Sequence, residues 1–175
     1  MSSAFNTYTI APFIKGLKSL SHTLKKGEEH ASQNNIPLDD LVNAALIDDM
    51  KPLSFQVFIT ANIAIKTLSR ATSVEPPAQE PSDKTFADFY KRIDETIAAL
   101  EKADPAAFAA NEGKTFKAPV GPKEFEFTPE SYALAFSIPN FYFHLVTAYD
   151  ILRAKGVPVG KADFLGEFFV GIPSV

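Results

Sequence analysis

Apolar residues recur three and four positions apart along three long stretches of the chain, which is the spacing of one helix face. These stretches span roughly residues 8–31, 49–70 and 82–100. Their apolar stripes consist, in chain order, of Phe13, Leu17, Leu20 and Leu24; Phe58, Ala61, Ile65 and Leu68; and Phe86, Phe89 or Tyr90, Ile93, Ile97 and Leu100. Since each apolar face has to pack against another one, the pattern predicts a helix bundle.

Helix-capping signals mark the ends of these stretches and of a fourth helical region. Thr85 with Asp88 resembles a capping box, and Asp104 is a natural N-cap residue for a short turn. Thr128, followed by a proline, begins the last helical region, and Gly156 ends it. Pro139 lies inside that region and is expected to kink or interrupt it.

The segment before the last helix has the alternation of a strand instead. Its alternating apolar residues are Phe116, Ala118 and Val120, followed by Phe125 and Phe127. Gly121-Pro122 separates the two sets as a turn signal, so the segment predicts a small β-hairpin. The expected fold is therefore all-α: one up-and-down four-helix bundle over residues 1–175, with the hairpin inserted before the last helix.

Two further segments connect or extend the bundle. Residues 72–83, "TSVEPPAQEPSD", are polar and rich in proline, and they predict a loop that cannot continue a helix. The tail after Gly156 is apolar and punctuated by glycine, and we expect it to pack on the bundle.

Composition narrows the classes of function. The net charge is −4, so no general attraction to nucleic acid or to an anionic membrane is expected. The absence of cysteine excludes disulfides, thiolate nucleophiles and cysteine zinc sites. The N-terminus lacks the pattern of a secretory signal and no apolar run is long enough to span a bilayer, so a cytoplasmic protein is expected. The 16 phenylalanines fill a core or line an apolar ligand pocket.

The three histidines are the main candidates for chemistry, because nucleophile and phosphate-loop motifs are absent. His22 is expected at the surface, and His30 near the end of the first helix, where the helix dipole favours its charged form. His144 stands inside the apolar run "FYFHLV", with Asn140 one turn earlier on the same face. A buried histidine stays neutral and requires a partner, so His144 is either a satisfied core residue or the acid/base group of a pocket.

Other polar and aromatic residues are candidate substrate contacts. Gln56 and Asn62 interrupt the apolar helix "LSFQVFITANIAI", and His144 is one possible partner for them. The remaining candidates are Tyr8, Tyr142, Tyr149 and Phe58. No metal site is predicted, because helical zinc sites typically use two histidines four apart and Asn140 holds that position before His144.

The stretches "PNFYFHLVTAYDILRAKGVPVGKADFLG", "DDMKPLSFQVFITANIA" and "KKGEEHA" resemble an uncharacterised family of bacterial and fungal proteins. It is the domain-of-unknown-function family numbered 1993, grouped with the DinB/YfiT-like four-helix bundles. The resemblance implies a DinB-type bundle that is often dimeric. DinB-like relatives commonly hold a divalent metal with three histidines between helices, and some are thiol-dependent transferases or isomerases. This sequence does not show that triad, and Asn62 stands where an acidic residue is expected.

Three hypotheses of function follow. The first is a metal-independent enzyme without a cofactor, in which His144 performs acid/base chemistry on a small apolar, natural-product-like molecule. The reaction would be of the isomerase, cyclase, dehydratase or decarboxylase type. The second is a non-catalytic ligand-binding protein or a structural homodimer, and the third is a DinB-like divalent-metal enzyme.

Overall fold

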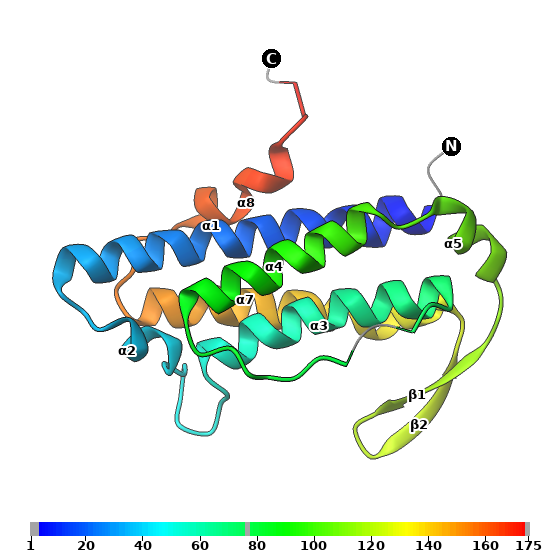
Figure 1. Ribbon diagram of the computed structural model, residues 1–175, viewed down its shortest axis with the longest axis horizontal. Coiled ribbons are helices and arrows are strands. Elements are labelled where there is room, and N and C mark those ends of the chain that lie inside the picture. Colours follow the sequence, from blue (N-terminus) through cyan, green and yellow to red (C-terminus); the bar gives the residue numbers. More distant parts are fainter. Residues whose placement is uncertain (1–3, 76–77, 174–175) are drawn as a thin grey trace.

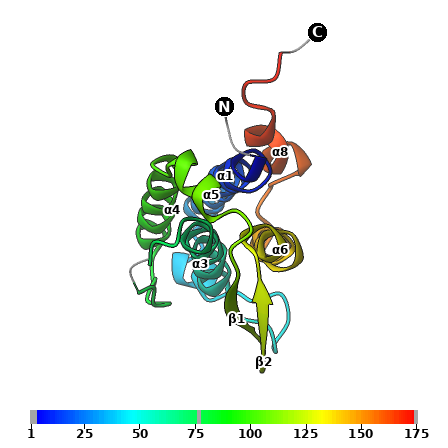
Figure 2. The same cartoon turned by 90° about the vertical axis from the view of Figure 1, so that its right-hand side faces the viewer.

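A computed structural model, which describes residues 4–75 and 78–173, contains four long helices packed side by side (Figure 1). They are α1 (Ala11–Asn34), α3 (Leu53–Thr72), α4 (Phe86–Glu101) and α7 (Ile138–Ala154). The shorter elements are α2 (Leu38–Val42), α5 (Pro105–Asn111), β1 (Phe116–Val120), β2 (Lys123–Phe127), α6 (Pro129–Tyr132) and α8 (Lys161–Phe169). Seen from the end, α8 lies outside the bundle against α1, and the hairpin projects away from the opposite side (Figure 2).

The direction of each long helix follows from contacts along its length. Gly16 and then Gly27 on α1 face Phe141 and then Leu152 on α7, so these two helices are parallel. Helices α3 and α4 also run in the same direction, and the connection between them returns along the molecule (Figure 1). The predicted all-α bundle with a hairpin before the last long helix is confirmed. The up-and-down arrangement is refined in one respect: α3 and α4 follow each other in the chain but run in the same direction, because a long connection joins them.

Local signals in the sequence account for the element boundaries. The side chain of Thr85 accepts a hydrogen bond from the Asp88 amide, and Thr128 does the same for Ser131, so both helices begin with a capping box. Asp104 caps α5 as predicted. The hairpin is antiparallel with Phe116 opposite Phe127, as the alternation predicts.

Helices α1 and α3 continue a few residues beyond their predicted ends. Each helix stops at a residue with positive φ, Asn35 at 54° and Ser73 at 57°. Such left-handed residues commonly terminate helices, and asparagine adopts this conformation more readily than most residues other than glycine. The Pro76-Pro77 pair of the predicted proline-rich loop lies outside the described residues.

Two wide π-helical turns precede prolines in the long helices. The turn η1 (Asn6–Ile10) ends two residues before Pro12, and η2 (Ala133–Ser137) ends two residues before Pro139. Proline has no N–H group, and its ring displaces the carbonyl one turn earlier, so the ladder before it has to shift. The kink expected at Pro139 therefore takes the form of a π turn, in which Ile138 donates to the Ala133 carbonyl.

The apolar tail packs on the bundle through α8. Ser19 on α1 is fully buried and donates to the Phe164 carbonyl at 2.7 Å, and Lys15 donates to the Phe168 carbonyl at 2.9 Å. Beyond α8, Val170 and Ile172 remain 64% and 60% exposed. The expectation that the tail packs therefore holds as far as α8. Across the described part of the chain, none of the helices combines the length and the apolarity that crossing a membrane requires.

Candidate functional site

His144 on α7 and Gln56 on α3 form a hydrogen-bonded pair between antiparallel helices. The Nδ1 of His144 lies 2.7 Å from Oε1 of Gln56. Gln56 is 2% exposed, and its Nε2 donates to the Lys51 carbonyl at 2.8 Å. Since the amide nitrogen is committed to that carbonyl, Oε1 is the acceptor and Nδ1 of His144 carries the hydrogen. In the neutral ring, Nε2 is therefore the basic nitrogen.

The surroundings of His144 favour this neutral form. Burial lowers the pKa of the imidazole to about 4, so the ring is uncharged at neutral pH. The Phe55 and Phe143 rings meet it edge-on, with centroids at 6.2 and 5.1 Å. Phe143 is 58% exposed, so the pair lies near the surface of the bundle. Nε2 makes no hydrogen bond to any residue that the structure describes.

The other predicted polar contacts do not join this pair. Asn140 is partly buried, one turn before His144, and its side chain has no hydrogen bond within the described chain. Asn62 follows Gln56 by six residues, which places it about 120° around the helix. It is 6% exposed, and its Oδ1 finds no partner there. Phe58 is also on another face, under the guanidinium of Arg92 at 4.9 Å.

The three tyrosines lie apart from His144. Tyr8 is 70% exposed near the N-terminus. Burial raises the pKa of Tyr142, whose ring packs edge-on against Phe141. Tyr149 donates to the Val159 carbonyl at 3.3 Å, and so helps to fix the turn after α7. The substrate-binding role of these residues, and of Asn140, Asn62 and Phe58, stays a prediction.

The three-histidine metal site of DinB-like proteins does not fit this chain. His22 meets Asp163 at 3.2 Å, and His30 accepts from Asn34 at 3.2 Å, so each histidine has a different partner. Over residues 4–75 and 78–173, no three histidine, aspartate or glutamate side chains are grouped closely enough to hold a metal ion. No step of the proposed chemistry is therefore routed through a metal.

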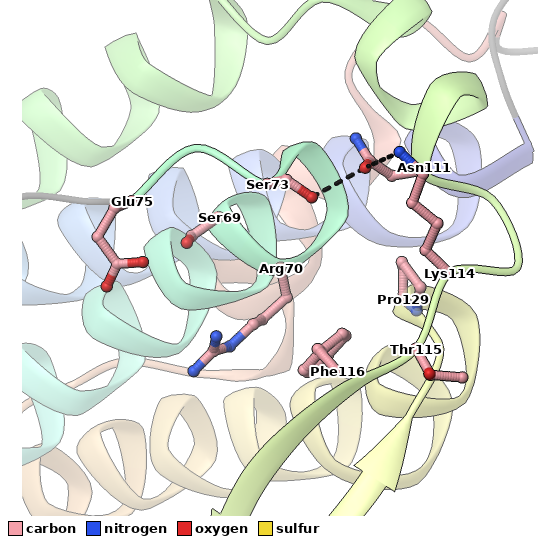
Figure 3. Close-up of a pocket in the computed structure, with 9 residues that line it drawn as sticks. All are labelled: Ser69, Arg70, Ser73, Glu75, Asn111, Lys114, Thr115, Phe116 and Pro129. Carbon is pink, nitrogen blue, oxygen red and sulfur yellow. Dashed lines mark hydrogen bonds between the residues drawn. The ribbon is translucent and has the colours of Figure 1, made fainter.

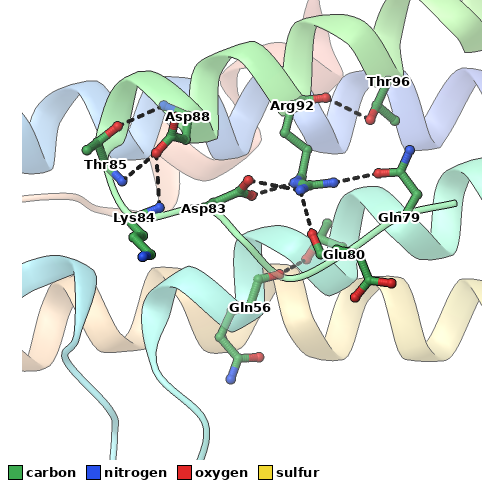
Figure 4. A network of polar contacts seen from close by, with 10 residues as sticks. Gln56, Gln79, Glu80, Asp83, Lys84, Thr85, Asp88, Arg92 and Thr96 are labelled. Carbon is green, nitrogen blue, oxygen red and sulfur yellow. Dashed lines mark hydrogen bonds and ion pairs between the residues drawn. The ribbon is translucent and has the colours of Figure 1, made fainter.

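Arg92 on α4 is the centre of a polar network that the helical patterns do not indicate (Figure 4). Its guanidinium donates to both carboxylate oxygens of Asp83, to Oε1 of Gln79 and to the Glu80 carbonyl. The two charged side chains are 13% and 8% exposed. The network fastens the connection before α4 over α3. The Gln56 side chain points away from it in Figure 4, so the two polar groups are separate.

A cavity of about 280 Å³ lies at the far end of α3 (Figure 3). It is lined by Ser69, Arg70, Ser73, Glu75, Asn111, Lys114, Thr115, Phe116 and Pro129. His144 is not one of these residues. Sequence reasoning misses the cavity, and the one available signal is a charged residue, Arg70, near the end of an apolar helix.

Comparison with known proteins gives a family and a fold. Residues 5–165 match the model of a domain of unknown function, DUF1993. The crystal structure of a DinB family member protein from Shewanella denitrificans is similar, with a TM-score of 0.83 and 33% sequence identity. The match covers 95% of this chain and 92% of that one. No curated protein matches the chain.

Proposed function

Since the chain belongs to the DUF1993 family and has a DinB-like helical fold, we propose that it binds a small, largely apolar molecule at His144 and performs metal-independent acid/base chemistry on it. The site is the surface formed by the imidazole and the flanking rings of Phe55 and Phe143. No metal or cofactor takes part in the proposed reaction.

One observation carries the proposal: the imidazole is oriented on one side and uncommitted on the other. The Lys51 carbonyl fixes Gln56, and Gln56 in turn fixes the tautomer of His144. A base whose second nitrogen is held by another group is the usual arrangement for proton transfer. Nε2 is then the atom that accepts a proton from a bound molecule.

The low pKa limits the chemistry. A base with a pKa of about 4 abstracts only fairly acidic protons at neutral pH, and its conjugate acid returns the proton readily. This behaviour suits a proton shift within one molecule, because the proton leaves one atom and is delivered to another. Isomerisation, cyclisation, dehydration and decarboxylation all contain such a step.

A non-catalytic ligand-binding protein is the second candidate, and the same low pKa favours it. The neutral Nε2 keeps a lone pair that accepts a hydrogen bond, and this contact does not require it to take up the proton. A homodimer is part of this proposal, because Phe143, Val146 and Leu134 leave apolar area exposed, with exposed fractions of 58%, 41% and 60%. The DinB-like metal enzyme is not favoured over either candidate.

A pair of probe molecules tests the binding step. Phenol carries a hydroxyl donor on an apolar ring, and toluene has the same shape without the donor. In a titration followed by ¹⁵N NMR of the histidine rings, phenol is expected to shift the Nε2 resonance of His144, with a smaller effect from toluene. In His144→Gln, followed through the backbone amide resonances of α3 and α7, the preference for phenol over toluene should be lost. Equal responses to both molecules would contradict a donor-reading site.

Hydrogen–deuterium exchange tests the chemical step. An apolar 1,3-diketone such as benzoylacetone has methylene hydrogens that are acidic enough for a weak base, and in D₂O it exchanges them faster when a base is positioned next to them. Wild-type protein should accelerate the exchange, and His144→Gln should lose the acceleration while keeping the fold. Binding of phenol without any acceleration of exchange would favour the non-catalytic candidate.

A further inference from the structure

We propose that the cavity at the C-terminal end of α3 binds the oxyanion group of a small metabolite, either a carboxylate or a phosphate ester. The cavity has a volume of about 280 Å³, which suits a small molecule and not a polymer. Gln56 and Arg70 are fourteen residues apart on α3, or about 21 Å along the helix. The site is therefore independent of the proposed function at His144.

Arg70 supplies the first part of the binding chemistry. Its guanidinium carbon lies over the Phe116 ring, 5.1 Å from the ring centroid, and this cation–π contact holds the group at the wall of the cavity (Figure 3). It makes no hydrogen bond and no ion pair with any residue in the described part of the chain. A guanidinium held by a cation–π contact, with its N–H donors uncommitted, matches the two oxygens of a carboxylate or phosphate.

Ser69 supplies a hydroxyl at the wall of the same cavity. The threonines of α3 use their hydroxyls within the helix, and Thr60 and Thr67 donate to the carbonyl four residues earlier at 2.7 Å each. Ser69 is 8% exposed as a whole residue, and its hydroxyl makes no hydrogen bond within the described ranges. Because this hydroxyl lines the cavity and is not used within the protein, it is a second group that can donate to an anion there.

The opposite wall carries a second cation on a fixed support. The Oδ1 of Asn111 accepts from the Ser73 hydroxyl at 2.8 Å and from Nζ of Lys114 at 3.2 Å. Asn111 is 5% exposed, and its own amide donates to the Ala107 carbonyl at 2.8 Å. Its orientation is therefore determined, and the ammonium of Lys114 keeps donors for an anion.

The carboxylate of Glu75 offsets part of the positive charge of the cavity and so determines which ligand charge is favoured. The cavity is lined by two cations, Arg70 and Lys114, and by one carboxylate, Glu75. Glu75 forms no ion pair with either cation in the part of the chain that the structure describes. The lining thus has one net positive charge, which favours a singly charged anion. Removal of the Glu75 charge should tighten binding.

The experiment is an NMR titration of the ¹⁵N-labelled full chain with two probes, benzoate and inorganic phosphate. Either anion should shift the amides of Ser69, Ser73 and Phe116 in a saturable manner. Tighter binding of benzoate identifies a carboxylate ligand, and tighter binding of phosphate identifies a phosphate ester. If neither anion shifts these amides, the proposal is overturned.

Variants that should weaken anion binding and a variant that should tighten it distinguish a specific site from a general effect of net charge. Arg70→Met should weaken binding by at least about tenfold, because it removes a charge-assisted hydrogen bond. Ser69→Ala should weaken it by a smaller factor, and Glu75→Gln should tighten it. Lys25→Gln removes an exposed cation from α1 and should leave binding unchanged. Equal weakening by Lys25→Gln and Arg70→Met would overturn the proposal, and circular dichroism of each variant checks its fold.

Discussion

Arg92 and Arg70 lie on neighbouring parallel helices, and each covers a phenylalanine ring, at 4.9 and 5.1 Å. Arg92 gives its donors to Asp83, Gln79 and the Glu80 carbonyl. Arg70 gives none to any described residue. One arginine is thus part of the architecture, and the other faces a cavity. Two arginines in similar surroundings thus differ in whether their N–H donors are already bonded within the protein, and that difference separates a structural group from a candidate binding group.

Arg92, whose donor nitrogens are all bonded within the protein, should be the more costly of the two arginines to replace. Arg92→Met should lower the free energy of unfolding by about 3–5 kcal/mol, because it leaves the buried carboxylate of Asp83 unpaired. Urea denaturation measures the change. Asp83→Asn in the same background should recover part of the loss, since it removes the stranded charge. A change below about 1 kcal/mol, as expected of an exposed ion pair, would show that the network is not structural.

The same reasoning extends to the Gln56–His144 pair, where the expected effect is smaller. Gln56→Leu removes the acceptor for Nδ1–H and should cost about 1–3 kcal/mol. It should also release the tautomer of His144, which ¹⁵N NMR of the ring nitrogens detects directly. Gln33→Leu, at an exposed position on α1, is the matched control and should change stability by less than about 0.5 kcal/mol. An unchanged tautomer would contradict the orienting role of Gln56.

The pH dependence of stability is the next test of this pair. The pKa of His144 is about 4 in the folded protein and about 6.5 in an unfolded chain. Between these values the unfolded state binds the proton and the folded state does not. The contribution of His144 is therefore complete above about pH 6.5 and is lost as the pH falls towards 4. Allowing for solvent screening, the loss should be on the order of 1–2 kcal/mol.

His144→Gln isolates this contribution, because the carboxylates of the chain titrate in both proteins. The difference in the free energy of unfolding between wild type and variant, measured from pH 7 down to 4, should decrease steadily. A difference that stays constant over this range would show that the pKa of His144 is not lowered.

Replacement of Arg70, whose donors are not bonded within the described chain, should have little effect on stability. Arg70→Met should change the free energy of unfolding by at most about 1 kcal/mol, since only the stacking on Phe116 is lost. Thermal denaturation beside Arg92→Met makes the contrast direct. A loss as large as that of Arg92→Met would mean that Arg70 is also a structural group, and it would remove the basis for an anion site.

The sequence predicts those features that depend on neighbours in the chain. Thr85 and Thr128 cap their helices because the capping partner lies three residues away, and the hairpin follows from alternation around Gly121. Pro139 predicts a distortion, although its π-helical form depends on how the whole helix adjusts. These are short-range effects, and the residues that cause them lie within a few positions of one another in the sequence.

The candidate sites depend on the long-range arrangement and are predicted less completely. The rule that a buried amide needs a partner identifies Gln56 with His144, but it does not distinguish Gln56 from Asn62, whose Oδ1 has none in the described chain. The cavity at Arg70 brings together the end of α3, the end of α5 and the start of the hairpin. The pattern of apolar residues within one helix or strand does not predict which other elements it meets, so the cavity could not be predicted from the sequence.

The parallel pairing of α3 and α4 also bears on how the chain assembles. A helical hairpin closes over a few residues, whereas the start of α4 has to return along α3 before it can pack beside the start of that helix. Such non-local contacts slow folding, because the entropy of closing the loop is lost before the contacts form. Asp83 and Arg92 are only nine residues apart, and their ion pair ties the end of the connection to α4. This ion pair needs no contact with α3, so it adds a local interaction to the non-local contacts that place α4 beside α3.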